Sequence, residues 1–381
     1  MRGSVLMAYA WRNMFARRVS TAVTLVAIAA AVLVSVVMAS MADGIGRIAT
    51  GSGAPENLIV LSKGASGAEA SILDRWTLHR LAETDGLRQA SDGSVAASAE
   101  LLVVQAASGV GGERRYITLR GVTPTALDVH GAVEITAGRW PQRPGEILIG
   151  RLVPANLGPV SVGDEIVFGG RPRRVVGAFA AGGQVFEGEI WMRLEDLRQE
   201  TGRRGASIVT LATTGPGVAA DMRRRIEGAR HIDVDVERET DYYGKIREAS
   251  TAFVFLGNLI GWIMGLGAAL AGMNTMYAAM SRRVREMGTL RALGFGRRTV
   301  GGLVLLESAL VGALGGALGV ALAMAVDERA LHLLGLSFEL DVRPDRLAQG
   351  CILALAVGVG GGWLPARNAS RLGIVEALRH R

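Results

Sequence analysis

The sequence predicts an α-helical membrane protein with four transmembrane helices and a large α+β extracytoplasmic domain between helices 1 and 2. Four apolar segments, each about 20 residues or longer, can cross the roughly 30 Å hydrocarbon core of a bilayer. The stretch between the first two has a globular character, with short β patterns separated by glycine turns. Arginine is concentrated in short segments beside the apolar runs, as is typical of cytosolic loops.

Composition and charge distribution support this class. A mean hydropathy of +0.29 with 20% charged residues is too apolar for an ordinary soluble protein and too charged for a chain wholly within lipid. The three segments that we expect in the cytosol hold fourteen arginines and two glutamates. They therefore carry +12, and the rest of the chain carries −5 of the net +7. Because the positive charge is divided in this way, we expect no nucleic-acid partner.

Few residues suit catalysis or cofactor binding. The single cysteine, Cys351, lies in an apolar run and excludes a disulfide framework. The five histidines are scattered without the spacing of metal ligands. Neither lysine, Lys63 or Lys245, ends a GxxxxGK[ST] phosphate loop. We therefore expect no metal site and no cofactor in this chain, and any ATP hydrolysis to belong to a partner.

The N-terminal part is predicted to hold a surface helix and the first span. Residues 1–18 alternate apolar and basic groups, which predicts an amphipathic segment on the cytosolic membrane surface. Residues 19–42 form the first transmembrane segment. A cleaved signal peptide is the alternative, but this apolar run is longer than the usual signal core of about 7–15 residues. We expect a retained helix.

Residues 43–249 are predicted to form the extracytoplasmic α+β domain, in one lobe or two. Helical periodicity is found over Ser71–Glu83 and Val218–Glu227. Gly169 and Gly170 predict a hairpin turn between two strands. The segments that predict strands are NLIVL, RYITLRGV, GEILIG, DEIVF, RRVVGAF and Ile232–Glu237.

The second and third spans carry small-residue faces and one acidic residue. The second comprises residues 250–280 with a stalk, and Gly257, Gly261 and Gly265 recur every fourth residue, which predicts close packing with another helix or a second subunit. The alternative is a generally glycine-rich composition. The third span, residues 299–326, contains Glu307 two turns inside. This acid is either an intramembrane functional group or a structural residue that pairs with an arginine or reaches lipid headgroups. Gly312, Gly315, Gly316 and Gly319 form the small-residue face of the third span.

The remaining segments complete the predicted topology. Residues 327–346 form an extracytoplasmic loop, residues 347–366 the fourth span and residues 367–381 a cytosolic tail. Both termini are then cytosolic, in a multi-pass protein of the inner membrane. Cysteines placed at Gly111 and Gly202 are expected to lie outside this membrane, and those at Arg291 and Arg379 inside.

The predicted cytosolic loop, residues 281–298, reads SRRVREMGTLRALGFGRR. Six arginines accompany one acid, Glu286, while Met287, Leu290 and Leu293 recur at helical spacing. Gly294 and Gly296 are placed to end this helix. An ordinary solvated surface helix is one interpretation. A short amphipathic helix between two spans also suits a docking surface for a cytosolic partner.

Within this loop, REMGTLRALGF resembles the cytoplasmic signature of FtsX/MacB-like permeases, the membrane subunits of one class of ABC transporter. The start of the chain, the GEILIGRLVPANLG region and the tail are also similar to this family. The resemblance implies a permease subunit that couples ATP hydrolysis by a separate ATPase to movement of its extracytoplasmic domain. The coupling residues would be Arg282, Arg285, Glu286, Gly288, Arg291, Ala292 and Gly294.

The resemblance also implies partners and leaves alternatives open. Expected partners are a cytosolic ABC ATPase subunit, a second permease subunit in a homo- or heterodimer, and an extracytoplasmic adaptor or lipoprotein. The output would be export or extraction of a lipophilic substrate or lipoprotein, or FtsX-like mechanical control of a cell-wall hydrolase. A membrane-anchored sensor or hydrolase is a third possibility, since Ser66 in GASGA approaches a nucleophile elbow but requires a histidine partner.

Overall fold

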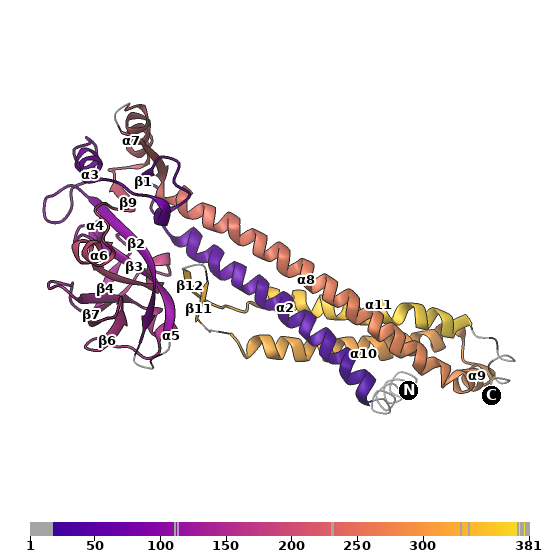
Figure 1. The fold of residues 1–381 in the computed structure, drawn as a ribbon. Coiled ribbons are helices and arrows are strands. Elements are labelled where there is room, and N and C mark those ends of the chain that lie inside the picture. Colours follow the sequence, from indigo (N-terminus) through magenta and orange to yellow (C-terminus); the bar gives the residue numbers. More distant parts are fainter. Residues whose placement is uncertain are drawn as a thin grey trace. The chain divides into compact units, whose positions relative to one another are not determined.

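The computed structural model describes residues 18–109, 112, 114–229, 232–327, 330–333, 336–371, 373 and 377. The predicted surface helix of residues 1–17 lies outside this part of the chain. Two compact units form (Figure 1). We call residues 1–42, 252–328 and 340–381 the helical unit, and residues 43–251 and 329–339 the inserted domain.

Among the residues that the structure describes, four helices are long and apolar enough to cross a membrane, and a short helix separates two of them. The helices are α2 (Arg18–Gly51), α8 (Glu239–Ser281), α9 (Val284–Ala292), α10 (Arg297–Met324) and α11 (Pro344–Arg371). Both α2 and α8 are longer than the predicted spans. At the end of α2, Ile45, Ile48 and Ala49 are buried at helical spacing, so packing of this stripe continues the helix past Ala42. The polar segment before the second span is helical too, as the predicted stalk requires.

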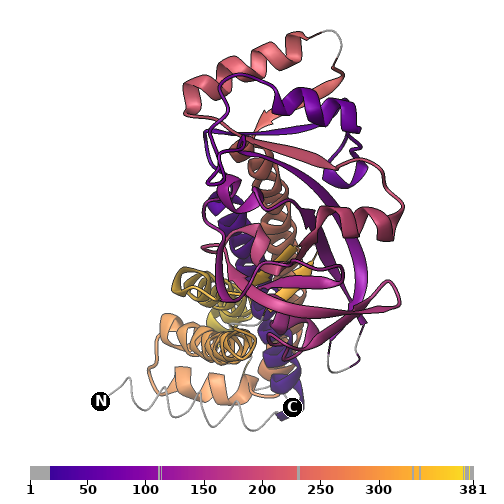
Figure 2. The ribbon, with the colours of Figure 1, turned by 90° about the vertical axis from the view of Figure 1, so that its left-hand side faces the viewer.

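Glycines bring the helices of the helical unit into close contact. An ideal Cβ on Gly312 would lie 2.8 Å from the Ala354 carbonyl oxygen on α11, and one on Gly319 would lie 2.7 Å from the Ala29 carbonyl oxygen on α2. The small-residue face predicted in residues 299–326 is therefore two faces, one packed on α11 and one on α2. Figures 1 and 2 show α10 and α11 side by side. This close approach suits helices that pack by van der Waals contact in lipid.

The inserted domain is built on a ten-stranded mixed sheet in the order β10-β1-β9-β2-β3-β8-β5-β7-β4, with β6 paired to β2 and β7. Most neighbours are antiparallel, but β3 with β8 and β5 with β7 are parallel. The strands are β1 (Asn57–Ser62), β2 (Ala97–Ser108), β3 (Arg114–Val122), β4 (Glu134–Gly138), β5 (Glu146–Gly150), β6 (Glu165–Phe168), β7 (Arg171–Ala180), β8 (Glu189–Arg193), β9 (Ile208–Ala212) and β10 (Val234–Arg238).

Two larger hydrophobic cores mark two lobes in the described part of the inserted domain, and a smaller cluster contains Ala96 and Val129. One core surrounds Leu119, Phe168 and Met192, and the other surrounds Leu58 and Met222. Figures 1 and 2 show two helices over the second lobe, α3 and α7. The helices of the domain are α3 (Arg75–Ala82), α4 (Ala126–Val129), α5 (Val153–Leu157), α6 (Leu194–Thr201) and α7 (Pro216–Gly228), with 3-10 turns η1 (Ala68–Ala70) and η2 (Val185–Gly188).

Local patterns predicted part of this domain well. The expected hairpin is present, because Gly169 and Gly170 have φ of 59° and 73° and join β6 to β7. One feature differs from the prediction. Residues 327–346 were expected to form a loop, but they contain the antiparallel strands β11 (Ala330–Leu333) and β12 (Leu336–Glu339).

Candidate functional site

The short helix α9 ends in a glycine turn that the sequence placed correctly. The Phe295 N–H donates to the Leu290 carbonyl oxygen at 3.1 Å, and the Gly294 N–H to that of Arg291 at 3.1 Å. This pair of bonds is a Schellman motif, with Gly294 at φ +90° after the last helical residues. Because a side chain with Cβ is strained at this φ, Gly294 sets the direction in which the chain leaves α9. Gly296 then caps the start of α10.

The inner face of α9 is anchored to the ends of the long helices. Met287 is buried in a cluster with residues of α8, α10 and α11. An ideal Cβ on Gly288 would lie 2.7 Å from the Ala377 Cβ, so Ala377 packs directly against this glycine. The predicted apolar face is only partly right: Leu293 is 72% exposed, because the helix ends at Ala292 and the chain turns away.

The outer face of α9 carries charge and exposed apolar groups. Arg282, Arg285, Glu286 and Ala292 are exposed, whereas Arg291 is half-buried. With Leu293 exposed beside them, these residues present a mixed basic and apolar surface. Of the seven predicted coupling residues, Gly288 faces inward, and Gly294 shapes the turn.

Arg283 was not among the predicted coupling residues, yet it lies between two acids. Its Nε is 3.6 Å from Glu286 Oε2, and its Nη1 is 3.6 Å from Glu307 Oε2. The i,i+3 spacing of Arg283 and Glu286 was a signal available in the sequence. Glu307 is 7% exposed, and its pairing with Arg283 agrees with the predicted alternative of an arginine partner. Arg283 thus links α9 to α10.

The glycines of the second span pack within the chain. An ideal Cβ on Gly257 would lie 2.4 Å from the Met38 Cβ, and one on Gly261 would lie 3.0 Å from the Ser35 Cβ, both on α2. An ideal Cβ on Gly265 would lie 2.9 Å from Val357 Cγ2 on α11. This face is therefore occupied by α2 and α11 of the same chain. It serves helix packing here and leaves no open space for a second subunit.

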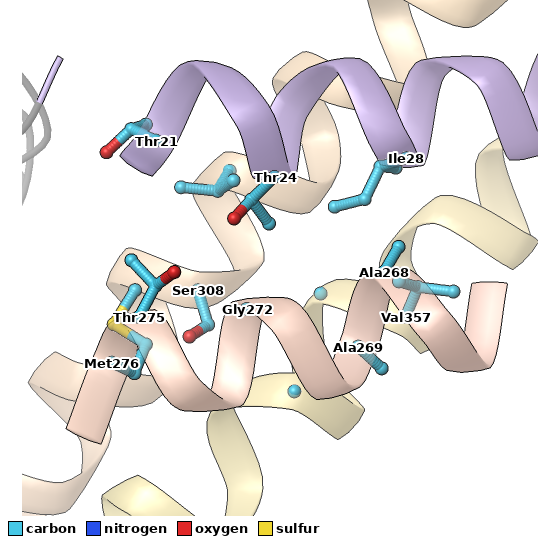
Figure 3. A pocket seen from close by; sticks show the side chains of 13 residues that line it. Thr21, Thr24, Ile28, Ala268, Ala269, Gly272, Thr275, Met276, Ser308 and Val357 are labelled. Carbon is cyan, nitrogen blue, oxygen red and sulfur yellow. The ribbon is translucent and has the colours of Figure 1, made fainter. Parts of the chain in front are cut away.

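A small cavity lies among α2, α8, α10 and α11 (Figure 3). Its volume is about 30 Å³, and its wall includes the hydroxyl groups of Thr21, Thr24, Thr275 and Ser308. A cavity of this size holds one or two water molecules. It is far smaller than the roughly 300–1,000 Å³ of ligand pockets, so it does not accommodate a drug-sized substrate.

A buried ion network in the inserted domain is the main feature that sequence reasoning missed. Arg120 on β3 donates to both carboxylate oxygens of Glu189, at 2.6 and 2.7 Å, and to Glu100 Oε2 at 2.5 Å. His130 Nε2 lies 2.6 Å from Glu100 Oε1, and His130 Nδ1 lies 3.3 Å from Glu239 Oε1. All of these side chains are at most 7% exposed. We call these five residues the buried network.

The charges of the buried network shift the pKa values of His130 and Glu100. Burial alone would lower the pKa of His130, but the carboxylates of Glu100 and Glu239 outweigh this effect and raise the pKa to about 9. Burial would raise the pKa of Glu100, but the positive charges of His130 and Arg120 lower it to about 2. At neutral pH, therefore, the imidazolium and the carboxylate are both charged.

The network also joins two chain segments to the sheet. Glu239 is the first residue of α8, and its Oε2 accepts from the Ala54 N–H and from Asn57 Nδ2, each at 2.9 Å. Ala54 and Asn57 follow the end of α2. An ideal Cβ on Gly53, which has φ +86°, would lie 2.9 Å from Glu239 Cγ, so the two segments touch without a side chain between them. Strands β2, β3 and β8 are thereby tied to both helix ends.

The hydrolase alternative gains no support from the described histidines. His79 contacts Glu83, and His130 is held by Glu100 and Glu239. Neither forms a hydrogen bond with Ser66 in the part of the chain that the structure describes.

Comparison with known families identifies this architecture. Residues 21–229 match the model of the MacB-like periplasmic core domain, and residues 258–374 match that of the FtsX-like permease C-terminal region. The chain belongs to the FtsX/MacB-like permease family. Members of this ABC transporter family are permease-type transporter subunits. The matched FtsX-like segment contains α9, α10 and α11.

Individual relatives are more distant. The macrolide export ATP-binding/permease protein MacB of Vibrio parahaemolyticus is 25% identical over 232 residues, which cover 57% of this chain and 35% of that protein. MacB of Psychrobacter arcticus is 32% identical over 133 residues, which cover 35% of this chain and 20% of that protein. The chain thus spans about a third or less of the length of these relatives. Among solved structures, the extracellular domain of the noncanonic ABC-type transporter YknZ is 16% identical, with a TM-score of 0.38, over 48% of this chain and all of that one.

Proposed function

We propose that this permease couples ATP hydrolysis on a separate ABC ATPase subunit to movement of the inserted domain. The observation that carries the proposal is the construction of α9. Its inner face is fixed to α8, α10, α11 and the tail, while its outer face presents arginines, Glu286 and exposed apolar groups. A partner that moves α9 would therefore act on every long helix anchored to it. ATP and Mg²⁺ would bind on that partner.

Two further observations support mechanical transmission. The cavity in the helical unit is too small for a drug-sized substrate. The 43 residues of α8 extend about 65 Å at 1.5 Å per residue, roughly twice the hydrocarbon thickness of a bilayer. We propose that α8 and α2 act as stiff stalks that transmit displacement to the sheet through the buried network, for export or extraction of a lipophilic substrate or lipoprotein.

The proposed assembly contains a second permease subunit and, outside the membrane, an adaptor or lipoprotein. Phe255, Trp262, Ile263 and Leu266 on α8 are exposed on faces that the packed glycines do not occupy. These faces suit lipid or the second subunit. The chain would lie in the inner membrane with both termini in the cytosol.

The coupling proposal is tested by the amount of ATPase subunit that co-purifies with the detergent-solubilised permease after co-expression. Glu286→Arg replaces the attraction between Glu286 and a basic group of the docked ATPase subunit by repulsion. Loss of one partner of such a desolvated pair costs about 2–5 kcal/mol. Gly294→Leu strains the left-handed turn by about 1–2 kcal/mol and redirects the chain. We expect both variants to insert into the membrane but to lose the ATPase subunit.

Matched controls separate docking from general effects. Glu227→Arg reverses an acid in an exposed ion pair of the inserted domain. Gly296→Leu adds the same side chain at φ −68°, in open space two residues from Gly294. Retention of the ATPase by Glu286→Arg and Gly294→Leu at the level of these controls would show that α9 is not the docking element.

The proposed orientation has its own test. Single cysteines replacing Gly202 or Arg291, in a Cys351→Ser background, are treated with an impermeant thiol reagent in cells with a permeabilised outer membrane. We expect labelling at Gly202 and none at Arg291 until the inner membrane is opened. Labelling of the Arg291 site in intact inner membranes would reverse the topology. Gly111 and Arg379, the other predicted markers, lie outside the described residues.

A further inference from the structure

A cavity of about 650 Å³ lies in the inserted domain, away from the buried network. Strand β2, the β6–β7 hairpin and α6 form its walls. Its basic side chains are Arg171, Arg173 and Arg203. Its size falls in the range of about 300–1,000 Å³ that is usual for ligand sites.

Local backbone geometry places two of these arginines. Gly169 and Gly170 form the left-handed hairpin turn, and Arg171 follows directly as the first residue of β7. Gly202, at φ +68°, ends α6 in a left-handed conformation, and Arg203 follows it. Both arginines are therefore presented by turns that depend on glycine. The cavity wall also includes the amide side chains of Gln105 and Gln199.

Two acids line the cavity beside the arginines. Asp196 accepts two bonds from Arg193, at 2.6 and 3.0 Å. Glu200 forms an ion pair with Arg173, although both of its carboxylate oxygens are buried and accept no hydrogen bond. In the described part of the chain, no carboxylate pairs with Arg171 or Arg203. The Nη1 atom of Arg203 is buried and has no acceptor there. A buried donor without an acceptor is costly, so an anionic acceptor would be favourable at this place.

The charges of the neighbouring arginines in the cavity wall also favour a bound anion. Burial lowers the pKa of Arg173, and the neighbouring charge of Arg171 lowers it further, against a smaller opposite effect of Asp196. Positive charges thus repel one another across this wall. A bound anion would relieve that repulsion.

We propose that this cavity binds a phosphate group. A guanidinium group offers paired N–H donors that match phosphate oxygens, and two arginines without carboxylate partners suit the charge of about −1.5 to −2 on a phosphate monoester. Gln105 and Gln199 add neutral donors, and Val103 provides an apolar wall for the carbon part of a ligand. Free phosphate and a phosphomonoester lipid headgroup share this chemistry. The site is independent of any docking at α9.

Isothermal titration calorimetry on the full chain, in a neutral detergent at low salt, tests the site. The probes are inorganic phosphate and dihexanoyl phosphatidic acid, with acetate as the monoanion control. The variants are Arg171→Gln and Arg203→Gln. We expect each to weaken binding at least about tenfold, since each removes a charged donor. The matched control is Arg174→Gln, which changes an exposed arginine of β7 outside the cavity wall.

Each result decides the proposal or the source of the phosphate. Binding of both probes that is lost in the two variants supports a site for phosphate as such. Binding of phosphatidic acid alone, lost in the same way, supports a lipid headgroup, and binding of inorganic phosphate alone supports the free ion. The proposal would be overturned if neither probe binds, or if Arg171→Gln and Arg203→Gln bind the probes with the affinity of the parent protein. It would also be overturned if Arg174→Gln weakens binding as much as those two variants do. Arg171 is exposed, so its variant is expected to fold, as a parental unfolding temperature would verify.

Discussion

The α9 end of the helical unit and the buried network use the same chemical groups in opposite ways. In the buried network, Arg120 lies 2.5–2.7 Å from the oxygens of Glu100 and Glu189, and its side chain is 2% exposed. At α9, Arg283 lies 3.6 Å from both Glu286 and Glu307, and the Glu286 side chain is 59% exposed. In the buried network the contacts are short and every side chain is buried, whereas at α9 the contacts are longer and Glu286 is exposed although Arg283 and Glu307 are mostly buried.

The difference shows what each region can do. Burial of charge is expensive, so each member of the buried network depends on its partners and fixes the geometry of the strands and helix ends that carry them. The carboxylate of Glu286 is exposed, so its pair with Arg283 contributes little and can be exchanged at small cost when another molecule approaches Glu286. A rigid joint and an adaptable contact surface are the two parts that mechanical transmission requires.

The largest expected effect comes from Arg120→Leu. This change leaves Glu100 and Glu189 buried without their shared partner, and removal of one member of a buried pair costs about 3–5 kcal/mol. We expect a large fall in the unfolding temperature of the inserted domain, which differential scanning fluorimetry of the full chain in detergent would measure. Arg224→Leu, which removes an exposed pair with Asp221, is the control and should change stability by less than about 1 kcal/mol. Equal effects would contradict the role assigned to burial.

The pH dependence of stability should show how much the charged form of His130 contributes to the free energy of unfolding. Its pKa is raised from 6.5 to about 9, so its contribution is complete below pH 6.5 and is lost as the pH rises through 9. The contribution is at most about 3 kcal/mol, since each unit corresponds to about 1.4 kcal/mol. We expect the unfolding temperature to fall between pH 6.5 and 9.5, and His130→Gln to flatten this fall. His79→Gln, an exposed histidine, should retain it. A parental pH profile in His130→Gln would contradict the prediction.

How much the sequence could reveal differs between the two regions. At α9, the information is local: the arginines, Glu286 and the glycine after the helix all lie within one short segment. Strand β1 and the β6–β7 hairpin were equally readable, because a short apolar run and a glycine turn are short-range signals. Strand β2, with its mixture of alanine, serine and polar residues, was not recognised, since its identity depends on pairing with β3 and β9.

The buried network could not be inferred in this way. Glu100, His130 and Glu239 are far apart in the sequence, and each alone resembles a surface residue. Only the sheet order and the return of the chain at the start of α8 bring them together. Arg120, a charged residue within the buried part of β3, was a local sign of it. The same limit applies to Arg283, whose second partner Glu307 lies on another helix.

A smaller effect is expected at the inner face of α9. Gly288→Ala places a methyl group where only 2.7 Å separates it from the Ala377 Cβ, and such overpacking costs about 1–3 kcal/mol. Gly302→Ala in α10 meets open space and gains up to about 1 kcal/mol of helix propensity. The two variants should therefore shift the unfolding temperature in opposite directions. Stabilisation by both would show that the tail does not pack on α9 as described.

The smallest expected effect sharpens the comparison most, because it measures the pairs themselves. A double-mutant cycle with Arg283→Gln and Glu286→Gln, read from denaturant unfolding of the permease alone, should give a coupling energy below about 1 kcal/mol. The corresponding cycle with Arg120→Gln and Glu189→Gln should give several times more, since that pair is bidentate and dry. If an ATPase subunit docks at α9 as proposed, it would remove solvent from Glu286, and we then expect the α9 coupling energy to rise. If instead the isolated α9 pair already equals the buried pair, Arg283 is held as rigidly as Arg120, and α9 is not the adaptable end of the molecule.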